Sequence, residues 1–402
     1  MEMRKVCLTA LGCAAALILL DAKVVRAVPA FARREGVACQ MCHFRVPELN
    51  EDGHAYLRRG LREEPSEGQM EGMEMGERAE SAPAATPRPL GVPLNLQWAN
   101  YLSVMGHHDF TAERGERPKF DAGAIDLWMG GPLNLRWSGL TNSAFEVEEN
   151  GASVDVAYGH YITRWASRFG SGRFGQVMPF AILFNQGGPS MPLSTPAVLS
   201  MPGGAGSSWT PTTLLRGLEV GGINLPRWDI YLGAGQPHLE GLPEDAENHT
   251  DIYASAERLL GASDNSLTAY AYWGHAWLSP VAPKRAFHRY GAFGNAYWKT
   301  RTKGVIGYLA GTDKAEDGRS LDNSGWFLLG EYLFDDRWAG YARWDRFRRD
   351  MAAGGSETTS GPALGVSWWA ATEIRLTLEA QFLKTTGQRR DRLLTTELLW
   401  IF

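Results

Sequence analysis

The sequence predicts an all-β fold, a membrane-spanning antiparallel β-barrel of about 16 strands, preceded by a small α-helical module. Three observations predict this fold. From residue 93 onward, apolar and polar residues alternate in segment after segment. The chain is rich in glycine (46) and in aromatic residues (15 Trp, 13 Tyr, 16 Phe). After residue 27 it has no run of about 18 apolar residues, which a membrane-spanning helix would need. Alternating strands with aromatic ends are typical of a barrel that faces lipid outside and water inside.

The first element is a predicted export signal at residues 1–27. Arg4 and Lys5 precede an apolar run over residues 6–20. Val25 and Ala27 place apolar or small side chains where a signal peptidase reads the chain. The apolar run is too short and wrongly flanked for a membrane span, so we expect cleavage after Ala27.

The second element, residues 28–60, contains Cys39-Gln40-Met41-Cys42-His43. This C-x-x-C-H pattern is the attachment signature of a c-type haem. Both thiolates bond to the macrocycle and His43 supplies an axial nitrogen to the iron. Cys7 and Cys13, the other two cysteines, fall within the export signal. A small disulfide loop and half a zinc site are alternatives, although zinc needs further close ligands and only His54 is near. The pattern predicts one covalently bound haem c.

The second axial ligand is less constrained by the sequence. His54 follows His43 closely enough to fold over the haem, and it is our first candidate for the distal ligand. Pro47 is expected to open the helix that carries His54, because proline suits the first helical position. The alternatives are an open or water-bound iron and a methionine of the following segment. These methionines are Met70, Met73 and Met75. Candidates to neutralise the haem propionates are Arg33, Arg34 and Arg45.

Residues 61–92 are predicted to be a linker. The segment is acidic, rich in proline and alanine, and free of aromatic residues. Such a composition cannot bury enough apolar surface to fold alone. Its methionines also allow a second interpretation, capture of Cu(I) by thioether sulfur.

Residues 93–402 are predicted to form the barrel. In 374–382 every second residue is apolar, from Ile374 to Phe382, and the residues between them are polar. The segment 338–345 alternates in the same way. The connections are mostly long after odd-numbered strands and short after even-numbered ones, which is typical of outer-membrane barrels. We expect the first strand at 93–105, the fifth at 176–184, and long outer loops at 106–118, 185–212 and 235–249. Trp98 and Trp137 are expected on the apolar face, and Phe402 ends the last strand. A soluble all-β protein is the alternative.

The segment around the haem motif resembles a known family. It reads Pro29-Ala30-Phe31-Ala32-Arg33, Gly36, the motif at 39–43, Pro47-x-Leu49-Asn50, Gly53 and Gly60. This pattern, with a linker and barrel after it, resembles the fused monohaem cytochrome c–porin family, whose best-known members are outer-membrane iron oxidases. The resemblance implies an outer-membrane protein that transfers electrons between an extracellular donor or acceptor, with Fe(II) as a candidate, and a periplasmic c-type cytochrome or other redox carrier.

Two other functions remain open at this stage. One is a diffusion porin whose haem module acts as a gate or sensor, and the other is a surface haem peroxidase with an open iron position. The net charge of -5 gives no basic footprint, so no nucleic-acid partner is expected. The remaining expected partner is outer-membrane lipid.

A surface iron site is a further candidate, because Fe(II) as a donor would need oxygen and imidazole ligands on the outer loops. Loop 235–249 offers Glu244, Asp245 and His249, and an acidic solvated loop is the alternative interpretation. Loop 106–118 offers a second set, namely His107, His108, Asp109, Glu113 and Glu116.

Overall fold

The computed structural model describes residues 30–61 and 101–401, apart from short segments. These segments are 114, 134–135, 147–150, 166–167, 189, 204–208, 224–227, 239–249, 261–264, 277–284, 299–300, 316 and 389–390. The export signal, nearly all of the predicted linker, Trp98 and Phe402 therefore lie outside the described residues. The boundaries of the signal and of the linker stay predictions.

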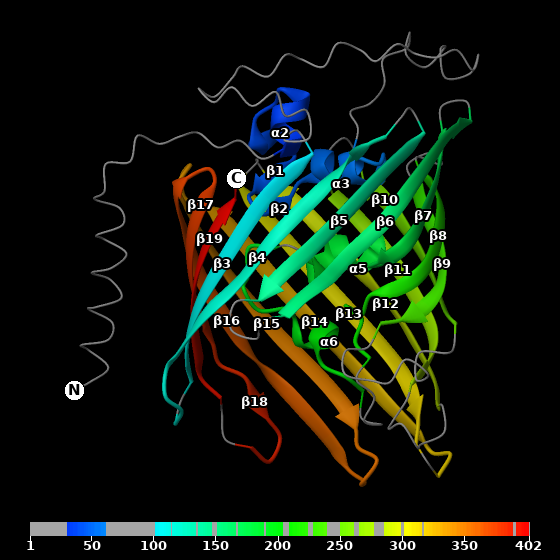
Figure 1. Cartoon of the computed structure of the whole chain (residues 1–402). Helices are drawn as coiled ribbons and strands as arrows, with labels where there is room; N and C mark the ends of the chain where they lie inside the picture. The colour runs from blue at the N-terminus through cyan, green and yellow to red at the C-terminus, as the bar shows by residue number, and fades with distance from the viewer. Residues whose placement is uncertain are drawn as a thin grey trace, which may run out of the picture.

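The described part of the chain is dominated by one closed antiparallel barrel (Figure 1). The short β18 continues the line of β17 and also pairs with β16, so the two are counted as one strand. On this count the barrel has sixteen membrane strands. The barrel closes through β19 and β3. The strands are β3 (Leu102–Glu113), β4 (Lys119–Pro132), β5 (Trp137–Glu146), β6 (Gly151–Trp165), β7 (Arg168–Val177), β8 (Leu215–Ile223), β9 (Trp228–Pro237), β10 (Asp251–Leu260), β11 (Asn265–Ala276), β12 (Arg285–Trp298), β13 (Thr302–Lys314), β14 (Ser320–Leu333), β15 (Trp338–Asp350), β16 (Ser356–Ala371), β17 (Ile374–Gln381), β18 (Lys384–Thr385) and β19 (Leu393–Ile401).

The two faces of each strand differ as the alternation predicts. On β15, Tyr341, Arg343 and Asp345 are buried inside the barrel, whereas Trp338 and Trp344 are exposed on its outer surface. Trp137 is exposed on the outer face too, as expected. This pattern, apolar outside and polar inside, is that of a barrel in lipid. No helix among the described residues is long and apolar enough to cross a membrane.

Two strand predictions were wrong. β3 begins at Leu102 and runs to Glu113, so most of the expected loop 106–118 is strand. Its polar residues were mistaken for a loop because lumen-facing positions of a barrel strand tolerate polar side chains. The fifth strand, β7, ends at Val177, and the expected strand at 176–184 is largely helical. Pro179 donates no ladder hydrogen bond, and a short apolar run fits a buried helix as well as a strand.

The N-terminal module, residues 30–61, is built from short elements. They are α2 (Ala30–Glu35), η1 (Cys39–Met41), β1 (His43–Arg45), β2 (Glu48–Leu49) and α3 (Glu51–Arg58). The prediction that Pro47 opens the helix was wrong, because Pro47 lies between β1 and β2. The helix begins after Asn50, whose side chain accepts a hydrogen bond from the Gly53 N–H at 2.9 Å. Asparagine at this capping position satisfies a backbone donor that proline could not reach.

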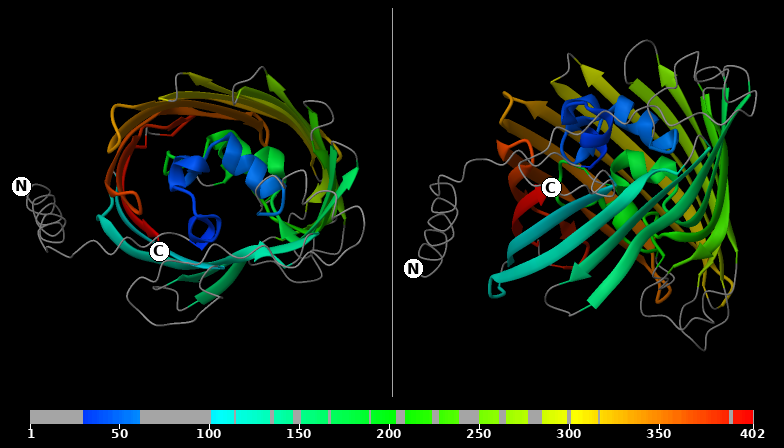
Figure 2. Two further views of the ribbon diagram at one scale, coloured as in Figure 1. Left: turned by 90° about the horizontal axis from the view of Figure 1, so that it is seen from above. Right: turned by 45° about the horizontal axis from the view of Figure 1, so that its top comes forward.

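The module lies in one mouth of the barrel, at the end where the C-terminus and the short turns lie (Figures 1 and 2). A second feature occupies the lumen. The described residues of the connection between β7 and β8 (178–214 apart from 189 and 204–208) fold inward, so the prediction of an outer loop at 185–212 was wrong. This connection carries α5 (Phe180–Ile182), η3 (Leu183–Gly187) and α6 (Ala197–Ser200). We call it the inner loop. The module and the inner loop are therefore both enclosed by the barrel wall (Figure 2).

Candidate functional site

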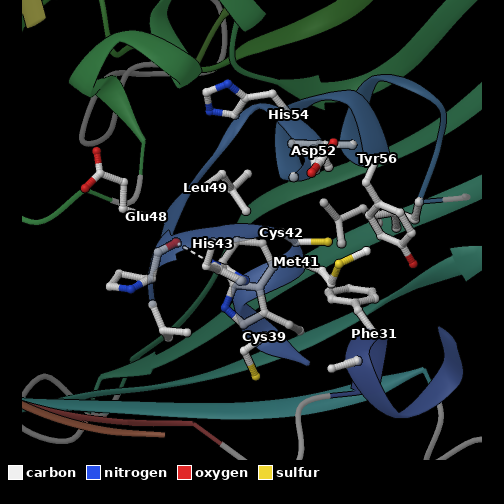
Figure 3. Close-up of a pocket in the computed structure, with 18 of the residues that line it drawn as sticks. Phe31, Cys39, Met41, Cys42, His43, Glu48, Leu49, Asp52, His54 and Tyr56 are labelled. Atoms are coloured by element: carbon white, nitrogen blue, oxygen red, sulfur yellow. Dashed lines mark hydrogen bonds between the residues drawn. The ribbon is translucent and has the colours of Figure 1, made fainter. Parts of the chain in front are cut away.

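A cavity of about 570 Å³ lies between the module and the barrel wall (Figure 3). Cys39, Cys42 and His43 all line it, so the structure brings the three motif residues to one space. The rest of the lining is mostly apolar. The wall and inner loop contribute Ser103, Met105, Trp128, Leu140, Val156, Tyr158, Arg173, Met178, Leu183, Phe184, Gln186, Lys303 and Ile401. A largely apolar cavity of this size is typical of a cofactor site.

The two cysteines are chemically available. Neither forms a disulfide within the described part of the chain, and both are partly exposed and line the cavity. Burial raises the pKa of the Cys39 thiol, with a smaller contribution from Glu373. Among the described residues, no group of three or more His, Cys, Asp or Glu side chains is arranged to hold a metal ion. A thiol pair without a disulfide, beside an apolar cavity, fits covalent attachment of a macrocycle.

His43 is oriented for ligation. Its Nδ1 lies 3.2 Å from the carbonyl oxygen of Pro47, and in the Nδ1–H tautomer it donates a hydrogen bond there. That bond fixes the ring and leaves Nε2 as the free ligand atom. Burial lowers the pKa of His43, which favours the neutral imidazole that binds metals. The geometry therefore fits the predicted role of His43 as an axial ligand.

Two residues of the family-like pattern hold the helix onto the motif. The Asn50 N–H donates to the Cys42 carbonyl at 3.0 Å, and the Asn50 side chain donates to the Met41 carbonyl at 3.1 Å. Gly53 lies so close to the motif that an added Cβ would be 2.0 Å from the Cys42 carbonyl oxygen. Only glycine permits this approach. Asn50 and Gly53 are thus required by packing.

His54, the distal-ligand candidate, lines the same cavity but is turned toward the inner loop. Its ring stacks on Phe184 with centroids 4.1 Å apart. In Figure 3 Leu49 lies between the rings of His54 and His43, and the His54 ring is turned away from the cysteine sulfurs. Burial, assisted by the nearby Arg58 charge, lowers its pKa to about 3. The ligand role of His54 stays a prediction. The linker methionines lie outside the described residues.

Two of the three predicted propionate partners have other contacts, and the side chain of Arg33 lies outside the described residues. Arg34 hydrogen bonds to the carbonyls of Gly130 (3.3 Å) and Leu61 (2.7 Å), so it joins the module to the barrel. Arg45 approaches the exposed Asp336 at 3.4 Å. Arg59 lines the cavity and was missed, because nothing in the sequence distinguishes it from other arginines of the module.

Buried ion pairs join the module to the barrel wall. The Arg58 guanidinium lies 3.1 Å from Asp229 and also contacts Glu257. All three side chains are nearly inaccessible, at 2%, 6% and 8% exposure. A second buried pair joins Glu48 to Lys303. These partners lie about 170 to 260 residues away in sequence. The pairs fix the position of the module because removing one partner of a buried pair is costly.

The inner loop supports the module from within the lumen. Phe184 stacks on Phe180 at 5.0 Å, and the Arg58 guanidinium lies 4.8 Å from the Phe184 ring centre. The loop itself is anchored to the opposite wall. The Leu193 N–H donates to Glu379 at 3.0 Å, and Arg349 donates to the Pro202 carbonyl at 3.0 Å. The lumen therefore holds a continuous packed body from β9 to β17.

The two predicted surface iron sites are tested to different extents by the structure. Glu244, Asp245 and His249 lie outside the described residues, so that site stays a prediction. His107 and Asp109, expected in a loop, are on β3, and His107 lies 3.7 Å from the lumen residue Asp126. His108 accepts a hydrogen bond from the Trp400 indole at 3.3 Å. The prediction of an exposed loop site at 106–118 is therefore wrong.

Comparisons with known proteins bear on the fold. No protein-family model matches the sequence, and no curated protein matches it. Many solved structures match, including three outer-membrane proteins that each cover 75% of this chain. OmpT of Vibrio cholerae without loop L8 has a TM-score of 0.59 at 12% identity, with 98% of that chain covered. The anion-selective porin from Comamonas acidovorans has a TM-score of 0.57 at 10% identity, with 98% of that chain covered. The outer membrane channel DcaP of Acinetobacter baumannii has a TM-score of 0.54 at 13% identity, with 96% of that chain covered. The chain has the fold of outer-membrane porins.

Proposed function

We propose that this protein is an outer-membrane c-type cytochrome–porin that transfers electrons between an extracellular donor or acceptor and periplasmic redox carriers. The observation that supports it is the convergence of Cys39, Cys42 and His43 on one apolar cavity inside a porin-like barrel. When bound, haem c would supply reversible one-electron chemistry at its iron. The two thiols would hold it covalently and His43 would be its proximal ligand.

The placement of the module supports this function. In outer-membrane barrels the short turns face the periplasm. The module lies at the short-turn mouth, so the cavity would be near the periplasmic partner. The apolar wall residues Trp128 and Leu140 would exclude water from the haem, which is one way a protein sets a haem potential. An extracellular donor would reach this site only through the lumen or its outer loops.

The polarity of the lumen wall favours a cationic donor such as Fe(II). On β3, Met105 lines the cavity, and His107 and Asp109 follow it on the same strand toward the long loops. Asp126 lies beside His107, and Glu397 pairs with Asp109 in the barrel register. This acidic wall would repel an anionic donor. The direction of electron flow follows from the potentials of the partners and not from the fold.

The first test asks whether haem is attached. The double variant Cys39→Ala/Cys42→Ala should lose covalent haem in a denaturing gel stained for haem, while Met41→Ala should keep it. The His43→Gly variant should keep some covalent haem but change its absorbance spectrum. Retention of haem by the double cysteine variant would refute the attachment.

The second test asks what donates electrons. Oxidised, detergent-purified protein is mixed with Fe(II) without oxygen, and the haem bands are followed by stopped-flow absorbance. Fast saturable reduction that weakens in Glu244→Gln, Asp245→Asn and His249→Gln variants would support iron oxidation and the predicted outer-loop site. Reduction by dithionite but not by Fe(II) would leave electron transfer with another donor.

A second function is favoured by the fold itself, a diffusion porin gated by its haem module. The inner loop and the module both occupy the lumen, so movement of the module would change the open cross-section (Figure 2). Planar-bilayer conductance distinguishes the two functions. A conduit for electrons should stay closed in both haem redox states, whereas a haem-controlled porin should open in one of them.

A further inference from the structure

A cationic patch lies on the outer face of the barrel near the long-loop end. Arg346 and Arg348 alternate with buried neighbours on β15, and both are exposed. Lys384 of β18 is also exposed. Ser360 pairs with Arg346 on one side and with Lys384 on the other. The three basic side chains therefore surround one stretch of β16 on the lipid-facing surface.

The spacing within this patch suits one anionic group. Neighbouring strands are about 4.8 Å apart, so Arg346 and Lys384 start about 10 Å from each other. Arg348 is two residues further along β15, about 7 Å away. Their long side chains can converge over Ser360. The nearest carboxylate is Asp350, 3.6 Å from Arg348, and both side chains of that pair are partly exposed. Such a pair contributes little and leaves Arg348 able to bind another anion.

The height of the patch can be worked out from β15. Trp338 starts the strand at the short-turn end, and its ring lies 6.1 Å from that of Trp368 in an outward-facing aromatic pair. Ten residues separate Trp338 from Arg348. With about 3.4 Å per residue and a tilt near 40°, Arg348 stands about 26 Å above Trp338. This matches the apolar band of an outer-membrane barrel, about 25 Å tall.

The surroundings of the patch agree with a membrane boundary. Trp326 of β14 pairs with Arg346 and is exposed on the same outer face, about 5 Å below Arg348 by the same arithmetic. Tryptophan is enriched where apolar lipid meets headgroups. An arginine on the lipid face is costly at the middle of the bilayer and nearly without cost at the interface. The patch therefore lies where phosphate headgroups lie.

We propose that Arg346, Arg348 and Lys384 form a binding site for the phosphate of an outer-leaflet glycolipid headgroup. The guanidinium groups suit phosphate because their planar donors match its oxygens. Trp326 and Trp344 contact the acyl region just below. The site is independent of haem, and it fixes the vertical position and the tilt of the barrel in the outer leaflet.

The test uses the detergent-purified full chain and diphosphoryl lipid A, titrated by native mass spectrometry. The same lipid without its phosphates is the matched ligand. The test variant is Arg346→Gln/Arg348→Gln/Lys384→Gln. The control is Arg258→Gln, because Arg258 is exposed on the outer face of β10 near the opposite end. Each basic group near an anionic lipid surface raises the binding affinity by a factor of about five. The triple variant should therefore bind diphosphoryl lipid A about a hundredfold more weakly than the parent.

Each outcome decides the proposal. A preference of the parent for phosphorylated lipid, lost in the triple variant and kept within twofold in Arg258→Gln, supports the site. Equal binding of both lipids, an unchanged triple variant or an equal loss in the control overturns it. If the triple variant does not fold, judged by heat-modifiable gel migration, Lys384→Gln alone should show a loss of about fivefold.

Discussion

Arg58 offers the sharpest test of how the module is held. Its guanidinium is almost wholly buried between Asp229 and Glu257 and lies over Phe184. In Arg58→Met the apolar stem remains, but two carboxylates lose their cation inside the lumen. Removing one partner of a buried ion pair costs about 3–5 kcal/mol. Since about 1.4 kcal/mol is a factor of ten, the docked state should weaken by about a thousandfold.

The assay is ion conductance in planar bilayers, with limited proteolysis of the module as a second readout. The parent should conduct few ions, and its module should resist proteolysis. Arg58→Met should show openings and faster cleavage within residues 30–61. The matched variant, Arg58→Met/Asp229→Asn/Glu257→Gln, removes the orphaned charges and should recover much of the docking. If Arg58→Met stays closed and resistant, or if the triple variant is no better docked, the buried pairs do not hold the module.

Three further predictions follow from buried and lipid-facing positions. His54 has its pKa lowered to about 3, so the docked module resists its protonation whereas a released module does not. The free energy of docking should be constant above pH 6.5 and should weaken below it, by about 2 kcal/mol at pH 5. His54→Phe should remove this pH dependence. A parent protein whose docking does not change with pH would contradict the burial of neutral His54. Gly53→Ala should destabilise the module by about 1–3 kcal/mol, seen as a lower melting temperature of the haem absorbance band, although alanine normally favours a helix. A raised melting temperature would contradict the close contact with Cys42. Leu328→Arg, on the outer face within the apolar band, should cost about 2–4 kcal/mol of folding stability in vesicles, and a cost near zero would mean that this face does not meet lipid.

Much of the barrel could be predicted because its signal is local. The alternation at 338–345 and 374–382 reports which side of a strand faces the lumen, and the structure confirms it with Arg343 and Asp345 inside and Trp344 outside. The number of strands is also confirmed. The misplaced first and fifth strands share one cause. A local pattern cannot tell a polar strand that faces a lumen from a polar loop, or a short buried helix from a strand.

The motif predicted the chemistry of the candidate site, and its close spacing is the reason. Cys39, Cys42 and His43 are brought together by five consecutive residues, so no tertiary contact is needed to propose haem. The roles of Asn50 and Gly53 became visible only when α3 was seen packed on the motif. The helix start was misplaced because Pro47 and Asn50 both suit a helix N-terminus, and the geometry of the turn decides between them.

The sequence by itself determined the barrel, its two faces and the haem-attachment motif, because periodicity and motif spacing act over a few residues. Tertiary structure alone decided what the lumen contains. It places Arg58 against Asp229 and Glu257, and Glu48 against Lys303, across separations that no local pattern specifies. It also turns residues 178–214 inward to support the module. These contacts depend on tertiary structure because the closed barrel surrounds one enclosed segment with walls from distant parts of the sequence.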